Sequence, residues 1–126
     1  MNTGDVFYWN TDQVRGREER NKFHVYICEA DWQHDHTFLF INKSNSFGCD
    51  FEITQQECDF LTLPVSFISC VDPVFYSDGQ LSAFSNVPCG CLSQDCLARL
   101  ANHVADHDVM EERYKLHIHA AIRKVL

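Results

Sequence analysis

Residues 23–28, FHVYIC, and residues 37–41, TFLFI, decide the fold of this chain. The first stretch alternates apolar and mixed residues, and the second is a continuous apolar run. Together they predict consecutive β-strands, with 37–41 at the centre of a sheet. Further stretches rich in β-branched and aromatic residues predict strands at 5–9, 49–53, 65–70 and 74–76. Strands this short and closely spaced predict a small antiparallel barrel or a strongly bent sheet.

Helical spacing replaces this pattern towards the C-terminus. Ser93 can cap a helix, and apolar residues then recur every three or four positions, which predicts a helix at about 93–106. Asp108, with Glu111 three positions later, has the pattern of a capping box, which predicts a last helix at about 109–125.

The length and composition are those of one folded domain: 126 residues, of which 45% are hydrophobic and 22% charged. The sequence thus predicts an α+β, mainly β fold, with a single domain over 1–126 and its strands between about 5 and 76. No apolar run approaches the roughly 20 residues of a membrane helix, and the N-terminus lacks the pattern of a signal peptide. Seven cysteines without such a leader indicate reduced thiols, so we expect a cytoplasmic protein with no membrane partner.

The charge is acidic, with a formal net charge of −8, which counts against a general nucleic-acid binder. Residues 15–22 are the exception, because four basic and two acidic side chains give this stretch a local charge of +2. A basic loop on an acidic body indicates either a localised anion site or a solvated loop.

One set of cysteines and histidines has ligand types that suit zinc. The set is Cys89, Cys91, Cys96, His103 and His107. Its helical members share a face, but the spacing differs from the usual C-x2-C knuckle. Ordinary thiols are the favoured interpretation, so we predict no metal and no other cofactor.

The loop expected at 11–22 is the remaining candidate for chemistry, because the chain has no G-x-S-x-G, P-loop or G-x-G-x-x-G motif. Its cations could bind phosphates, and Glu18 could act as a general base or neutralise the loop. RNA cleavage without metal needs such groups: a base for the 2′-hydroxyl, cations for the phosphorane charge and an acid for the leaving oxygen.

In this arrangement the chain resembles the MazF/PemK family of toxin–antitoxin ribonucleases. Short motifs spread over nearly the whole chain carry the resemblance. They are the opening strand Gly4-Asp5-Val6-Phe7, the loop residues Asp12, Gly16 and Glu18, the second strand 22–27, the Phe-Glu-Ile strand 51–53, the strand 66–70 and the helix start 90–100.

The resemblance implies an SH3-like barrel, a homodimer that binds RNA across its two subunits, and a cognate antitoxin protein that blocks the site. The implied activity is metal-independent cleavage of single-stranded RNA by 2′-hydroxyl attack. The implied site has Arg15, Arg17 and Lys22 on the phosphate, Glu18 as the base, and Ser44 as a hydroxyl near the scissile group.

The chain also departs from the family pattern. Lys22-Phe23 stands where the family usually has Arg-Pro, and Arg17 where PemK-like members have His. Leu61 and Leu63 fall near positions where some members carry Arg and Asp. These departures and the acidic body favour an alternative, a non-catalytic barrel of the same kind that binds a protein partner.

The last predicted helix gives a second reason to expect a homodimer. Its apolar face, formed by Tyr114, Ile118, Ile122 and Val125, is larger than a small barrel is expected to cover.

Overall fold

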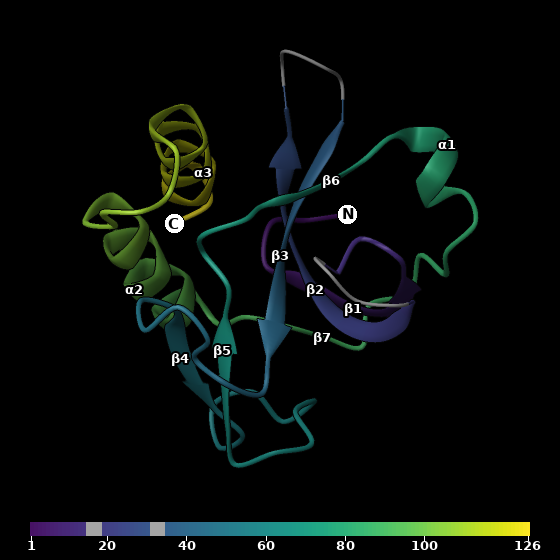
Figure 1. Ribbon diagram of the computed structural model, residues 1–126, viewed down its shortest axis with the longest axis horizontal. Coiled ribbons are helices and arrows are strands. Elements are labelled where there is room, and N and C mark those ends of the chain that lie inside the picture. The colour runs from purple at the N-terminus through teal and green to yellow at the C-terminus, as the bar shows by residue number, and fades with distance from the viewer. Residues whose placement is uncertain (15–18, 31–34) are drawn as a thin grey trace.

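The structure is a computed structural model that describes residues 1–14, 19–30 and 35–126. Within these ranges the chain forms a seven-stranded sheet and three helices (Figure 1). The elements are β1 (Asp5–Thr11), β2 (Arg20–Glu29), β3 (His36–Asn42), β4 (Phe51–Thr54), β5 (Val65–Ile68), β6 (Val74–Tyr76), α1 (Asp78–Leu81), β7 (Gly90–Cys91), α2 (Gln94–Ala105) and α3 (Glu112–Lys124).

The sheet is antiparallel and curled into a half-barrel, in the order β4-β5-β3-β2-β1-β7, with β6 also paired to β3. One edge of β3 pairs with β2, while the other meets β5 near Ile41 and β6 near Phe38. Figure 1 shows β1 and β2 curving strongly while α2 and α3 lie together on the opposite side of the molecule from α1. The predicted α+β, mainly β class and the central place of 37–41 are both confirmed.

Both faces of the central strands are apolar. Successive side chains of a strand point to opposite sides, and β2 and β3 each contain consecutive buried apolar residues. Val25 and Ile27 of β2 belong to the larger cluster, which also contains the buried residues of α2 and α3. Tyr26, between them in sequence, belongs to a second cluster that is almost entirely aromatic. The members of this aromatic cluster are Phe7, Trp9, Tyr26, Phe38, Phe40, Val74 and Tyr76.

The two predicted C-terminal helices are present, with one of the two predicted caps. The Ser93 side chain accepts a 3.1 Å hydrogen bond from the Cys96 amide and begins α2. The Asp108–Glu111 capping box is wrong, because α3 begins at Glu112 without any side-chain cap bond. His107 Nδ1 instead accepts the amides of Val109 and Met110, which holds this segment in a turn.

Most of the apolar face of α3 is covered within the chain. Ile118 and Ile122 are fully buried in the larger cluster, and the half-buried Tyr114 ring lies 5.2 Å from that of Phe75. Val125 is 41% exposed, so the expectation that this face exceeds what the sheet covers holds only at its last residue, and the homodimer stays a prediction. Within the described ranges, no helix combines the length and apolar character needed to cross a bilayer.

The buried face of α3 predicts the effect of a small truncation. Ile118→Val removes one methylene group from a side chain with 0% exposure, which should lower the free energy of unfolding by about 0.5–1.5 kcal/mol. Leu116→Val is the matched control, because Leu116 is 62% exposed on the same helix and should change stability little. Urea unfolding of the two variants tests this, and equal losses of stability would contradict the assigned face.

Candidate functional site

A pocket of about 530 Å³ opens where the start of β2 meets the end of β3. Antiparallel pairing places Phe23 opposite Ile41, so the residues before Phe23 lie beside those after Ile41. This register brings Arg20 and Lys22 to the same pocket as Lys43. The other lining residues include Asn42, Ser44, Phe40, Phe47 and Asp72.

Lys22 is a half-buried cation of the pocket with a lowered pKa. Burial, followed by the neighbouring positive charges of Arg20 and Lys43, lowers its pKa from 10.5 to about 8. Its Nζ donates a hydrogen bond to Asn42 Oδ1 and lies 5.6 Å from the centre of the Phe40 ring. A lysine in this state is a cation at neutral pH that can also release its proton near neutrality.

A chain of four hydrogen bonds, buried at its centre and partly buried at both ends, connects the backbone of Lys22 to the amide of Gln13 after β1. His24 Nδ1 lies 2.9 Å from the Lys22 carbonyl oxygen, which can only accept, so Nδ1 carries the proton and Nε2 accepts. Tyr76 Oη, 3.0 Å away, therefore donates to Nε2 and in turn accepts from Thr11 Oγ1 at 2.6 Å. Thr11 Oγ1 accepts the Gln13 amide at 3.1 Å, so every link has a fixed direction.

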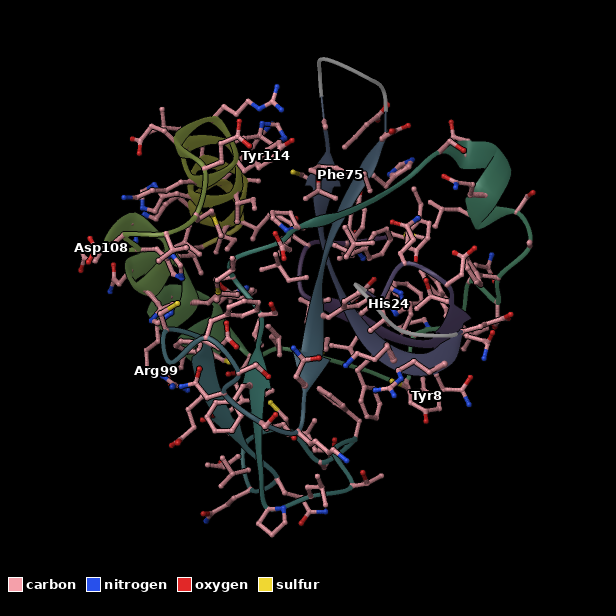
Figure 2. All side chains as sticks on the ribbon, in the orientation of Figure 1. Tyr8, His24, Phe75, Arg99, Asp108 and Tyr114 are labelled. Atoms are coloured by element: carbon pink, nitrogen blue, oxygen red, sulfur yellow. The ribbon has the colours of Figure 1, made fainter. Side chains whose placement is uncertain are left out.

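The environment of His24 keeps this imidazole neutral. Its exposure is 0%, and burial is the main cause that lowers its pKa from 6.5 to about 4. Its ring lies 5.1 Å from that of Trp9 and 4.9 Å from that of Phe40, within the aromatic cluster. Figure 2 shows His24 inside the strongly curved β1–β2 part of the sheet.

The structure brings together two of the site residues expected from the sequence, Lys22 and Ser44, because both line the pocket. Lys22 is a strand residue rather than a loop residue, since β2 begins at Arg20 and β1 continues to Thr11. The loop expected at 11–22 is accordingly shorter. Arg15, Arg17 and Glu18 lie outside the described residues.

Sequence reasoning missed several residues of the pocket, namely Arg20, Asn42, Lys43 and Asp72. The signal that could have found the first three was the hairpin register, which pairs the start of β2 with the end of β3. Asp72 follows β5 and had no local pattern that would place it here.

The five cysteines and histidines considered for zinc do not form one site. Cys89 and Cys91 are exposed, whereas Cys96 is fully buried. His103 Nε2 lies 2.8 Å from the Cys49 carbonyl oxygen, and His107 Nδ1 accepts two amides.

No protein-family model matches the chain, and neither does any curated protein.

Proposed function

We propose that this protein is the toxin of a type II toxin–antitoxin system and cleaves single-stranded RNA without a metal ion. The observation that carries the proposal is the charge of the pocket. Arg20, Lys22 and Lys43 line it together, and Asp72 is the carboxylate among its described lining residues. Such a concentration of cations on a chain of net charge −8 supports a ligand rich in phosphate.

The three cations suit the charge that develops during phosphoryl transfer. Attack of the 2′-hydroxyl on the adjacent phosphate produces a phosphorane with additional negative charge, which fixed cations stabilise. Lys22, with a pKa of about 8, would also give its proton to the leaving 5′-oxygen, because a proton donor works best when its pKa is near the working pH.

Two carboxylates are candidates for the general base that removes the 2′-hydroxyl proton. Glu18 is the candidate that the MazF/PemK resemblance implies, and Asp72 is the candidate that lines the pocket. Ser44 would provide a hydroxyl to a non-bridging phosphate oxygen. Arg15 and Arg17, from the segment between β1 and β2, would bind neighbouring phosphates.

An exposed aromatic side chain at the pocket supports single-stranded RNA as the form of the substrate. Phe47 lines the pocket and is 51% exposed, whereas Phe40 is 8% exposed and lies under Lys22. Unpaired bases stack on such rings with little dependence on their sequence, whereas the bases of a duplex are already stacked.

The remaining features of the proposal come from the resemblance. They are an SH3-like barrel, a homodimer, a cytoplasmic location and a cognate antitoxin protein. An acidic segment of the antitoxin would complement the cations of the pocket and exclude RNA from it.

The proposal is tested by incubating the purified protein with single-stranded RNA in excess EDTA. We expect cleavage that leaves 2′,3′-cyclic phosphate ends, and no cleavage of the same sequence when the nucleotide 5′ to the cut carries 2′-deoxyribose. Replacing both exposed cysteines, Cys89→Ser with Cys91→Ser, should leave the rate unchanged. Absence of cleavage, together with absence of growth arrest on induction, would contradict the proposal and favour the non-catalytic partner-binding barrel.

A further inference from the structure

A second group of chemically active side chains lies away from the pocket, between the turn after β4 and the start of α2. One ligand atom from each of Glu57, Cys58 and Cys96 lies within 4.8 Å of the other two. Cys58 is 2% exposed and Cys96 is 0% exposed, so the two thiols are buried together. Both are free cysteines.

The backbone positions of Cys58 and Cys96 are set by hydrogen bonds in two separate elements. The amide of Cys58 donates to the Thr54 carbonyl at 2.9 Å, which closes the turn after β4. Cys96 is the third residue of α2, and its amide donates to the capping hydroxyl of Ser93 at 3.1 Å. Hydrogen bonding to Cys58, followed by burial, raises the pKa of the Cys96 thiol, and the same hydrogen bond lowers the pKa of the Cys58 thiol, so the two sulfur atoms are in direct contact.

The carboxylate of Glu57 is also held in place by its neighbours. Its Oε2 accepts from Arg99 Nη2 at 2.7 Å, and its Oε1 accepts the Thr54 amide at 3.3 Å. Arg99 is positioned in turn by Asp95, whose Oδ2 lies 3.0 Å from Arg99 Nε. Figure 2 shows Arg99 beside α2 and β4, on the other side of the molecule from His24.

We propose that Glu57, Cys58 and Cys96 bind one zinc ion. Two thiolates and a carboxylate are ligands that zinc takes in proteins, and the observed spacing needs only a contraction of about 1 Å to reach tetrahedral distances. A divalent ion with these three anions leaves one negative charge, and the Arg99 guanidinium, which Asp95 shares, lies beside it. The Glu57 side chain is 29% exposed, so the ion would have a path of entry on this side, and a water molecule would supply the fourth ligand.

The bound ion would join two distant parts of the chain, the turn after β4 and the first turn of α2. Harder cations such as magnesium are excluded as the preferred occupant, because they favour oxygen ligands. The site is separate from the proposed RNA pocket, and its test does not depend on RNA cleavage.

The test measures metal content on the full chain, purified without an affinity tag under reducing conditions. We expect one zinc per chain, and a thiolate-to-metal charge-transfer band when cobalt replaces zinc. Cys58→Ser should weaken zinc binding by at least about 100-fold, and Glu57→Gln by at least about tenfold, measured by competition with a chromogenic chelator. The double variant Cys89→Ser, Cys91→Ser is the matched control and should bind zinc as the parent does.

Glu57→Gln keeps the test decisive if Cys58→Ser fails to fold, because Glu57 is only partly buried and glutamine retains its shape. The inference is overturned if the parent binds less than one zinc, or if both single variants keep parental affinity. It is also overturned if the cysteine control loses the metal, or if Cys58 and Cys96 are found as a disulfide under the reducing conditions.

Discussion

The Lys22→Met protein is expected to cleave single-stranded RNA about 10²–10³-fold more slowly than the parent and to unfold at a higher temperature. The loss of rate follows because one preorganised cation that faces developing negative charge commonly contributes this much. The gain in stability follows because burial of the Lys22 charge is unfavourable, as its pKa of about 8 indicates. Methionine keeps the apolar stem against Phe40 without the charge.

The matched control is Lys124→Met, which removes a lysine that is exposed at the end of α3. Its cleavage rate and unfolding temperature should both stay close to those of the parent. If the Lys22 and Lys124 variants cleave RNA equally well, Lys22 is not part of the machinery and the proposed site is wrong.

The pH dependence of the cleavage rate is an independent test of the proposed role of Lys22. Lys22 loses its charge as the pH rises through about 8, so the cleavage rate of the parent should fall above that pH. The free energy of unfolding should change with pH in the opposite direction. Between about pH 8 and 10.5 the unfolded chain binds more protons at this residue than the folded chain, so the contribution of Lys22 to the free energy of unfolding rises with pH.

The second large effect is the acid sensitivity that His24 gives the fold. Its pKa is about 4 in the folded chain against 6.5 in the unfolded chain, so the unfolded chain takes up the extra proton first as the pH falls. The contribution of His24 to the free energy of unfolding is fully present above about pH 6.5 and is lost as the pH falls through about 4. This pKa shift corresponds to about 3 kcal/mol of the free energy of unfolding.

We therefore expect His24→Gln to have a shallower loss of stability between pH 7 and 4 than the parent, measured by urea unfolding at several pH values. Glutamine does not titrate, and its amide can donate to the Lys22 carbonyl and accept from Tyr76. His119→Gln serves as the comparison, because it removes a histidine of α3 that lies outside this hydrogen-bond chain. Parallel stability curves for the parent and His24→Gln would contradict the assignment.

The strands were predictable because each is a short run that is either alternating or continuously apolar. The apolar run at 37–41 and its neighbours contain enough β-branched and aromatic residues to identify them as strands. The change to helical spacing after residue 88 identified α2 and α3 as helices. α1 and β7 have four and two residues, too few for any periodicity to identify them. The start of α3 was placed wrongly because His107 Nδ1 accepts the amides of Val109 and Met110, which holds this segment in a turn, and the helix begins only at Glu112.

The site could be predicted only in part, for a different reason. Lys22 carries a visible charge beside a strand, and Ser44 falls in a turn that the resemblance singles out. The position of Lys43 depends on strand register, and that of Asp72 on the path of the chain after β5. Cys58 and Cys96 come together only through tertiary packing, which no local spacing encodes.

The two apolar clusters on opposite faces of β2 and β3 have a consequence for how such a protein can diverge. The pocket belongs to the aromatic face, since Phe40 and Val74 contribute to both. The packing of α2 and α3 uses the other face. Substitutions that reshape the pocket for a different ligand can therefore accumulate while the helical layer stays as it is, so selection can act on binding and on stability through largely different residues.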